Sequence, residues 1–322
     1  MTARPASAAL ARSDPRVGSR NDPGEGLRRR VQHAVALGAT TWFRVGGPAE
    51  TLVRPANTAD LSDLLRSLPP DIPVQVIGAC SNVIIRDGGL PGVTIRLARG
   101  FTAITPEPGG IISGAGALDV TVAEHAAAAG LTGLEFLSGI PGTIGGAVTM
   151  NAGAYGGDIA TCLDWADIVA RSGEIVRLSA ADLAFAYRTA KLPPGGVIVR
   201  ARLRAQPGFP AAIAARMAEI RGTRQATQPV HARTGGSTFR NPPDMKAWEL
   251  IDGAGCRGLV RGGAKVSEKH CNFLINEGEA SAADLERLGE DVRRRVHAAT
   301  GVMLEWEIRR MGVPILLPEG NA

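Results

Sequence analysis

The stretch from Gly139 to Gly157 constrains the fold of this chain more than any other segment. It reads GIPGTIGGAVTMNAGAYGG, in which seven of nineteen residues are glycine and none is charged. Glycine allows tight turns and close approach to a flat or anionic partner, and main-chain N–H groups can hold a phosphate without lysine or arginine. Apolar residues alternate with the glycines, whereas a flexible linker would be polar and rich in serine. The stretch is therefore interpreted as a packed nucleotide-binding loop.

The composition favours a globular protein that handles anionic small molecules. Hydrophobic residues make up 44% of the chain, and the net charge of +5 comes from arginines scattered along its length. Aromatic residues make up only 4%, which leaves few stacking platforms for nucleic acid, and we expect no nucleic-acid partner. No apolar run reaches 18 residues, so we expect no membrane span.

The four cysteines show no CxxC pair and no paired Cys/His spacing. A metal site or a disulfide framework is therefore not expected, and a reducing, cytoplasmic location is the default. Residues 1–26 contain arginine, serine and proline but no apolar core of a signal peptide, and we interpret them as a disordered basic tail.

Periodicity and capping residues predict a mixture of helices and strands. Alternation predicts strands over residues 41–45, followed by a turn at 46–48, and again over 301–312, and a hairpin is predicted over 164–178. The segment 256–278 is interpreted as a turn. Further short strands are predicted on either side of residues 78–82, in 111–117 and in 197–203. Helices are predicted over 27–39, 57–68, 118–129, 179–185, 209–228, 246–254 and 281–300.

A second glycine-containing turn, Gly78 to Asn82, lies between two predicted strands, where main-chain N–H groups and the side chains of Ser81 and Asn82 can bind phosphate oxygens. A third candidate, Gly114-Ala115-Gly116, follows a strand and precedes a helix, as a Rossmann fingerprint would. Asp119 stands where its third glycine should be, so a Rossmann site is not favoured. Two separate glycine turns on short strands suit an extended dinucleotide better than a single βαβ crevice does.

Five motifs, in order, resemble the UDP-N-acetylenolpyruvoylglucosamine reductases. They are GACSN, GLEFLSGIPGTIGGAVTMNAGAYGG, AYRTAK, GGSTFRNP and LEWEIRRMG, and the resemblance extends over about residues 27–312. It implies an α+β fold: a two-part FAD-binding domain of the vanillyl-alcohol-oxidase type and a smaller α+β substrate domain. It also implies bound FAD, NADPH as reductant, and reduction of the enolpyruvyl ether of UDP-N-acetylglucosamine to UDP-N-acetylmuramate.

The resemblance also implies roles for individual residues. Arg188 matches the arginine that stabilises the enolate-like intermediate, Ser237 the proton donor, and Glu307 the catalytic carboxylate. Strand spacing alone does not separate Glu305 from Glu307, which lie two residues apart. Candidate substrate contacts are Tyr187, Arg240, Asn241, Arg257 and His270. Candidate cofactor contacts are Gly78, Ala79, Cys80, Ser81, Asn82, Gly139, Pro141, Gly142, Thr143, Gly145, Gly146 and Ala147.

The chain departs from the family pattern at the phosphate turn, where Cys80 replaces a glycine. A left-handed backbone at Cys80 would be strained. The short segment after Arg188 resembles the subclass that lacks an inserted substrate-covering loop. No histidine in the glycine turns is placed to tether a flavin, so we expect FAD to bind non-covalently.

We expect an FAD-binding domain over residues 27–208 and a substrate-binding domain over 209–322, whose last strand returns toward the flavin. We also expect a monomer. Two other functions stay open from the residues: an oxygen-using FAD oxidoreductase of the same domain type, and a nucleotide-binding module without activity. The presence of Arg188, Ser237 and Glu307 argues against the oxygen-using oxidoreductase. A measurement of turnover distinguishes the reductase from both alternatives.

Overall fold

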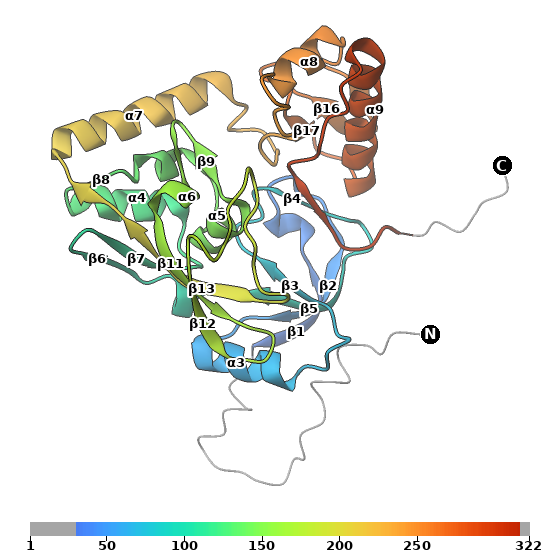
Figure 1. Ribbon diagram of the computed structural model, residues 1–322. Helices are drawn as coiled ribbons and strands as arrows, with labels where there is room; N and C mark the ends of the chain where they lie inside the picture. The colour runs from blue at the N-terminus through green and yellow to red at the C-terminus, as the bar shows by residue number, and fades with distance from the viewer. Residues whose placement is uncertain (1–29, 316–322) are drawn as a thin grey trace. The chain divides into compact units, whose positions relative to one another are not determined.

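The structure is a computed structural model that describes residues 30–315 of the 322-residue chain (Figure 1). The predicted tail over residues 1–26 lies outside the described residues. Two compact units account for the chain. Unit 1 contains Glu50–Ala79 and Gly92–Thr223 together with the described part of Met1–Ala34. Unit 2 contains Val35–Ala49, Cys80–Pro91 and the described part of Arg224–Ala322.

These units divide the chain differently from the predicted boundary at 208/209, because two segments from the N-terminal half belong to unit 2. Separate domains for cofactor and substrate stay a prediction. The α+β fold itself is confirmed by the mixture of sheets and helices. None of the helices in residues 30–315 combines the length and apolar character that a membrane span requires.

Unit 1 is built around an antiparallel sheet in the order β12-β11-β13-β7-β6 (Figure 1). The predicted hairpin is confirmed as β11 and β12, and the predicted strand after it as β13. The strands are β6 (Ile104–Glu107), β7 (Gly110–Gly114), β11 (Leu163–Val169), β12 (Ile175–Ser179) and β13 (Val197–Arg204).

Consecutive residues of β13 face two different cores, because successive side chains of a strand point to opposite faces of its sheet. Ile198 packs with residues of α4 (Asp119–Ala128) and α5 (Ile144–Met150). Val197 and Val199 pack with residues of α3 (Thr58–Ser67). Unit 1 therefore has two cores, as a two-part domain requires.

A second sheet has the order β1-β2-β5-β3, and most residues of its strands belong to unit 1. Next to it, α3 confirms the predicted helix, and Asn57 caps it, because the Asn57 side chain accepts a hydrogen bond of 2.9 Å from the N–H of Asp60. The strands are β1 (Val31–Ala36), β2 (Pro48–Val53), β3 (Val74–Ile77) and β5 (Leu90–Arg96).

The remaining elements of unit 1 are short except for one helix. The helix α7 (Pro210–Thr227) confirms the prediction over 209–228 and buries only Ile213, Met217 and Ile220. The short elements are η2 (Arg99–Phe101), β8 (Leu131–Thr132), η3 (Glu135–Gly139), β9 (Gly153–Ala154), β10 (Gly157–Asp158), α6 (Ile159–Cys162) and β14 (Gln206–Pro207).

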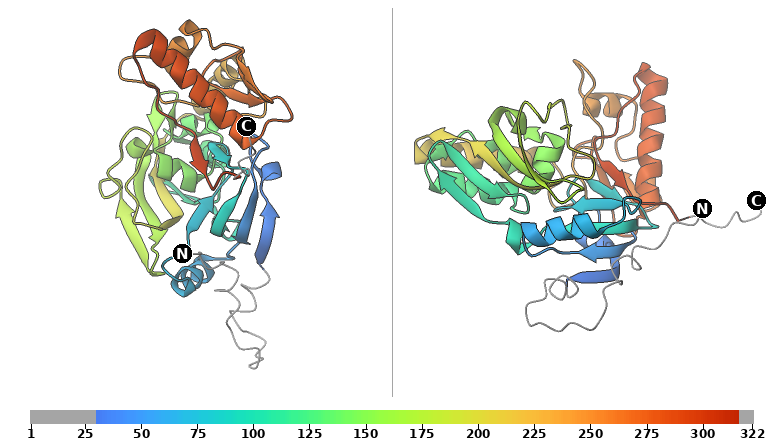
Figure 2. Two further views of the ribbon diagram at one scale, coloured as in Figure 1. Left: turned by 90° about the vertical axis from the view of Figure 1, so that its right-hand side faces the viewer. Right: turned by 60° about the horizontal axis from the view of Figure 1, so that its bottom comes forward.

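Unit 2 packs the helices α8 (Ala247–Gly253) and α9 (Ala282–Thr300) against a small antiparallel sheet, and both views of Figure 2 show the red helix α9 beside the orange segments of this sheet. The helix α9 confirms the prediction over 281–300, and it buries an apolar face that includes Leu285, Leu288, Val292 and Val296. Ser281 and Asp284 form a capping box at its start. The other elements are η1 (Gly38–Thr40), β4 (Val83–Ile85), β15 (Val260–Arg261), β16 (Ala264–Val266), β17 (Leu274–Asn276) and β18 (Arg309–Met311).

Two helix predictions are wrong. Residues 31–36 form the strand β1 instead of a helix, because this segment pairs with β2 and pairing with a neighbour overrides a weak local preference. Residues 180–184 form turns. The capping bonds between Ser179 and Asp182 are present, but Ala184 has a left-handed φ of 40°, which stops a helix from continuing.

Four other segments also differ from prediction. The glycine-rich stretch contains the helix α5, because Ile144, Ala147 and Val148 are buried on one side. Residues 41–45 alternate in burial but form no strand, and β2 begins at Pro48 in place of the predicted turn. Residues 256–278 contain the strands β15, β16 and β17, which are too short to give alternation. Only Arg309–Met311 of the predicted last strand is regular.

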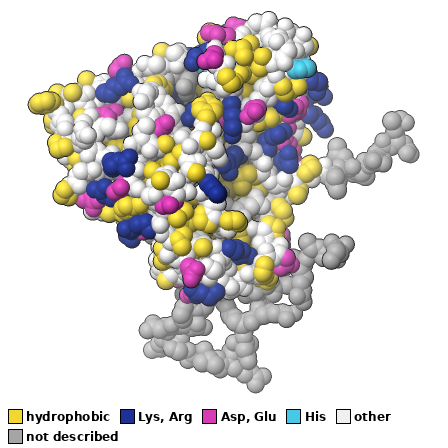
Figure 3. All heavy atoms as spheres, in the orientation of Figure 1, with side chains coloured by type: hydrophobic (Ala, Val, Ile, Leu, Met, Phe, Trp, Pro, Cys, Tyr) yellow, Lys and Arg dark blue, Asp and Glu magenta, His cyan; other side chains and the backbone are white. Residues whose placement is uncertain are grey.

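The larger sheet carries oppositely charged side chains on neighbouring strands. Figure 3 shows basic and acidic side chains interspersed on the face of the molecule that it draws. Asp167 on β11 accepts hydrogen bonds from Arg177 at 2.7 Å and Arg200 at 2.5 Å. Burial would raise the pKa of Asp167, but these hydrogen bonds outweigh it and hold the pKa below its ordinary value. Arg177 also lies 3.6 Å from the ring centroid of Trp165.

Asp119, at the start of α4, is a fully buried carboxyl group for which the described structure offers no hydrogen-bond partner. Burial raises its pKa well above the ordinary value. The folded state therefore keeps its proton to a higher pH than the unfolded state. Between these two pKa values the free energy of unfolding falls as pH rises, by up to about 1.4 kcal/mol per pH unit.

Asp119→Asn cannot ionise, so we expect it to gain stability relative to the wild type as the pH is raised above about 4. Melting temperatures of both proteins at pH 4, 6 and 8 measure this difference. Glu124→Gln, an exposed change on the same helix, is the control. A difference in melting temperature that stays constant with pH would contradict the prediction.

Candidate active site

The two glycine-rich segments meet in unit 1. A β-carbon added to Gly78 would lie 2.4 Å from the hydroxyl oxygen of Thr143, so only glycine allows this contact. Residues 115–119 hold the start of the stretch by main-chain hydrogen bonds. Ile144 donates to Ala117 O at 3.0 Å and Gly145 to Ala115 O at 2.8 Å.

The glycines of the stretch have different surroundings. Gly139 is buried, and a β-carbon there would lie 2.3 Å from the ring of Tyr155. A β-carbon on Gly157 would meet the ring of Phe136 at 2.7 Å. Gly146, in the first turn of α5, is exposed, and a β-carbon there would have only Thr143 Oγ1 nearby, at 3.8 Å. Glycine is thus needed for packing at the ends, while Gly146 leaves bare backbone at the surface.

Asn151, at the end of α5, connects the stretch to the turn that carries Arg188. Its φ is 42°, a left-handed conformation that asparagine tolerates better than most residues. Its side chain donates to Ala186 O at 3.2 Å and accepts from the N–H of Ala160 at 2.9 Å. Asn151 is not among the residues predicted from the sequence, although its Met-Asn-Ala-Gly context is a usable signal for a left-handed helix end.

Arg188 sits in a tight turn of unit 1. Ala186 and Thr189 exchange two main-chain hydrogen bonds of 3.1 Å across it, and Arg188 itself has a φ of 57°. A left-handed φ on a residue with a long side chain is uncommon and costs about 1 kcal/mol or more. Tyr187 is exposed, and its ring centroid lies 5.2 Å from the Arg188 guanidinium carbon.

The turn at residues 78–82 is divided between the units, with Gly78 and Ala79 in unit 1 and Cys80, Ser81 and Asn82 in unit 2. Cys80 has a φ of 53°, so the strain expected of a residue that replaces glycine is present. Its carbonyl oxygen accepts a hydrogen bond of 3.4 Å from the N–H of Trp42.

Ser237 lies in a loop of unit 2 that the buried side chain of Asn272 holds in place. Asn272 is 4% exposed. Its Oδ1 accepts from the N–H of Phe239 at 2.9 Å, and its Nδ2 donates to Phe239 O at 2.8 Å. The N–H of Thr238 donates to Asn272 O at 2.7 Å. The main chains of Thr238 and Phe239, which follow Ser237, are therefore held by the main chain and the side chain of Asn272.

The segment that carries Glu307 lies directly against this loop. The N–H of Glu307 donates to Thr238 O at 2.8 Å, and the Glu307 carbonyl oxygen accepts from the side chain of Asn82 at 3.2 Å. Asn82, Ser237 and Glu307 are thereby brought together in unit 2. Glu305 differs from Glu307, because its side chain is 75% exposed and lies 3.6 Å from Arg240.

Trp306, between these two glutamates, anchors the segment. Its ring centroid is 5.1 Å from that of Phe239, and its Nε1 donates to Glu290 on α9 at 2.8 Å. Burial would raise the pKa of Glu290, but hydrogen bonds from Trp306 and Arg293 outweigh it and lower that pKa. Glu290 therefore stays charged and holds the indole.

Arg257 and His270 lie near each other, and His270 belongs to the connection between β16 and β17 that also contains Asn272. Arg257 donates to both carboxylate oxygens of Asp252, at 2.8 and 2.6 Å. The ring of His270 lies between Phe273 and Trp248, with centroid distances of 4.8 and 6.4 Å. Burial, and to a smaller extent the charge of Arg257, lowers the pKa of His270, while a backbone hydrogen bond raises it. His270 is therefore uncharged at neutral pH.

Arg240 and Asn241 follow the Ser237 loop. Arg240 donates its N–H to Glu305 O at 2.9 Å, and its buried Nε has no hydrogen-bond partner among the described residues. Asn241 is exposed, and its side-chain oxygen accepts from the N–H of Ala247 at the start of α8 at 3.0 Å. The main chain of Arg240 and the side chain of Asn241 thus help to hold the loop.

Comparison with known families identifies two domains in the chain. Residues 49–179 match the model of an FAD binding domain, and residues 228–311 match the C-terminal domain of UDP-N-acetylenolpyruvoylglucosamine reductase. The first match contains both glycine-rich segments, and the second contains Ser237 and Glu307.

Relatives and a solved structure agree with these matches. The chain is 67% identical over 288 residues to UDP-N-acetylenolpyruvoylglucosamine reductase of Acidiphilium cryptum, covering 89% of this chain and 93% of that protein. It is 64% identical to that of Granulibacter bethesdensis, with 91% and 94% covered. The crystal structure of the reductase from Thermus caldophilus superimposes with a TM-score of 0.77 at 36% identity and covers 88% of this chain and 99% of that one.

We expect Asn272→Ala to loosen the Ser237 loop, because it removes both side-chain hydrogen bonds to buried Phe239, at a cost of about 2–4 kcal/mol in the free energy of unfolding. Amide hydrogen exchange separates the two contacts. The Phe239 amide should lose protection, while the Thr238 amide, bonded to the Asn272 main chain, should keep more of it. Wild-type exchange at Phe239 in the alanine variant would contradict the prediction.

Proposed function

The chain belongs to the UDP-N-acetylenolpyruvoylglucosamine reductase family, and on this premise we propose that Arg188, Ser237 and Glu307 carry the chemistry of its reaction. The protein is an FAD-dependent reductase of peptidoglycan precursor synthesis. It uses NADPH to reduce UDP-N-acetyl-3-O-(1-carboxyvinyl)-glucosamine to UDP-N-acetylmuramate.

The glycine-rich segments fit a flavin nucleotide. Gly146 leaves bare backbone at the surface of α5, and Gly78 lies against Thr143, so the two segments are adjacent where the cofactor needs close main-chain approach. Bound FAD supplies the hydride that adds to the terminal carbon of the enolpyruvyl group. We propose non-covalent contacts from residues 78–82 and from Gly139, Pro141, Gly142, Thr143, Gly145, Gly146 and Ala147.

Arg188 is proposed to stabilise the charge that hydride addition creates. That charge spreads toward the substrate carboxylate, and a fixed guanidinium group near it lowers the barrier most when it needs no reorganisation. The closed turn around Arg188 and the side chain of Asn151 support this role, because they fix the main chain from which the guanidinium extends. Tyr187 is proposed as a substrate contact beside it.

Ser237 is proposed to give a proton to the carbon next to the one that receives the hydride. A serine hydroxyl is a weak acid, so it needs a neighbour that relays a proton or polarises it. Glu307 is proposed as that neighbour. The main-chain hydrogen bond between Glu307 and Thr238 supports the pairing, because it fixes both segments to each other. Arg240, Asn241, Arg257 and His270 are proposed to contact the UDP-sugar.

We also propose that the protein works as a monomer in the cytoplasm. A UDP-sugar substrate and NADPH suit that compartment, and no disulfide joins the four cysteines, which all lie within residues 30–315. The molar mass of the FAD-loaded protein in solution, measured by light scattering, tests whether it is a monomer.

The purified protein should oxidise NADPH only when the enolpyruvyl UDP-sugar is present. Absorbance at 340 nm, with and without that sugar, measures the dependence. An oxygen-using FAD oxidoreductase would consume oxygen without the sugar, and a module without activity would leave NADPH unchanged. Oxidation at equal rates in both samples would therefore overturn the proposed function.

Ser237→Ala should leave reduction of the flavin by NADPH intact and slow its reoxidation by the sugar by about a hundredfold or more, because only the second half-reaction needs the proton. Stopped-flow absorbance follows each half-reaction separately. Ser172→Ala, in the exposed hairpin turn, is the matched control. An equal loss in both half-reactions would contradict the proton-donor role.

A further inference from the structure

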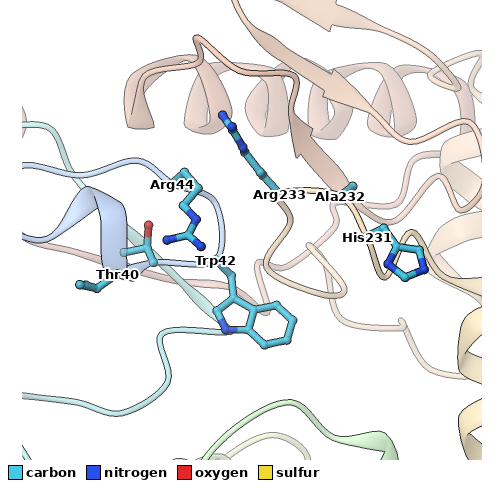
Figure 4. Close-up of a pocket in the computed structure, with 7 residues that line it drawn as sticks. Thr40, Trp42, Arg44, His231, Ala232 and Arg233 are labelled. Carbon is cyan, nitrogen blue, oxygen red and sulfur yellow. The ribbon is translucent and has the colours of Figure 1, made fainter.

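A cavity in unit 2 has no role in the function proposed above. Its volume is about 430 Å³, within the usual range for small-molecule sites. Two segments line it, and Figure 4 shows their side chains. The lining residues are Thr40, Thr41, Trp42, Arg44, His231, Ala232 and Arg233.

The lining is basic. Arg44, His231 and Arg233 are exposed, and no acidic residue contributes to the cavity. Arg44 donates to the main-chain oxygen of Ala39, and Arg233 donates to that of Gly278 at 3.3 Å. Within residues 30–315 neither guanidinium group has an ion pair with a carboxylate. Each has five N–H donors, so several are available to an anion.

The two segments are tied together by Asn276, which is 3% exposed. Its side chain donates to Phe43 O at 2.7 Å, and its N–H donates to Arg233 O at 2.9 Å. Phe43 also packs on Gly235, where a β-carbon would lie 2.3 Å from its ring. The cavity wall is thus held by buried contacts, which keep the arginine main chains on both sides in place.

The backbone at Arg44 has a left-handed φ of 58°. Thr41 fixes this turn, because its hydroxyl group donates to Gly38 O and Val45 O at 3.0 and 2.9 Å. Strained conformations of residues other than glycine persist where the surroundings impose them, and they concentrate at ligand sites.

Trp42 supplies an aromatic surface among these basic groups. It is half-buried, and in the view of Figure 4 its indole ring lies below the side chain of Arg44. An indole face beside cations is suited to a nucleobase that carries a phosphate nearby. Inorganic phosphate alone has no ring to stack on this indole face.

We propose that this cavity binds the adenosine end of NADPH, with Arg44 and Arg233 on the 2′-phosphate and Trp42 on the adenine. The inference rests on the proposed function, since NADPH is its reductant. The 2′-phosphate is the group that NADH lacks, and two guanidinium groups are a typical partner for it. Arg233 precedes Ser237 by four residues, which span at most about 14 Å, so an extended dinucleotide can reach from this cavity to the catalytic loop.

Titration calorimetry on the FAD-loaded protein tests the site without turnover. The wild type should bind 2′,5′-ADP at least about tenfold more tightly than 5′-ADP, and Arg44→Gln and Arg233→Gln should each remove most of that preference. Arg294→Gln, an exposed change on α9, is the charge-matched control and should keep it. Equal binding of both nucleotides by the wild type overturns the proposal, as does inorganic phosphate that binds as tightly as 2′,5′-ADP.

Kinetics provide the second readout. Each arginine variant should raise the KM for NADPH about tenfold or more and leave the KM for NADH within about twofold. Equal increases in KM for both reductants, or loss of FAD from the purified arginine variants, would overturn the proposal and indicate another role for the cavity. A wild type that prefers 2′,5′-ADP but lacks sugar-dependent NADPH oxidation would overturn the proposed function alone.

Discussion

Buried asparagine side chains hold together the parts of this protein where regular secondary structure stops. A main-chain amide that is buried outside a helix or sheet must find another partner, and an asparagine side chain offers both a donor and an acceptor. Asn151 does this for the Arg188 turn, Asn272 for the Ser237 loop, and Asn276 for the basic cavity. The proposed site residues therefore lie on irregular segments, and hydrogen bonds from buried asparagines hold these segments to the core.

This arrangement also explains where strain is tolerated. Cys80 and Arg188 both have left-handed backbones. Main-chain hydrogen bonds between Ala186 and Thr189 close the turn at Arg188, and the carbonyl oxygen of Cys80 accepts a hydrogen bond from the main chain of Trp42. The cost at each residue is small compared with the hydrophobic burial of either unit. Local strain is thus offset by packing elsewhere, and the turns that present the site residues keep one shape.

The sequence predicted the elements whose signals are local and left out those that depend on distant partners. The capped helices α3 and α9 carry their own start signals and apolar faces, so their positions were predictable. The strand β1 depends on pairing with β2, and the strands β15 to β17 are too short for a periodic pattern. Residue types and spacing left Glu305 and Glu307 equivalent; their difference arises from contacts with Arg240 and Asn82, which lie far away in sequence. The proposed roles of Arg188 and Ser237 rest on the resemblance to a family and not on periodicity.

The discontinuity of unit 2 has a consequence for how the chain folds. Its core contains Phe43, Val45 and Ile84 together with residues from Phe239 onward, so contacts that close it join segments separated by about two hundred residues. Such long-range closure is slow, because a large loop must be ordered before its contacts form. During synthesis on the ribosome, the early segments of unit 2 cannot complete this core until the C-terminal part of the chain has emerged. A fragment that begins at residue 209 would lack three buried core residues, so we expect that it cannot complete this core by itself.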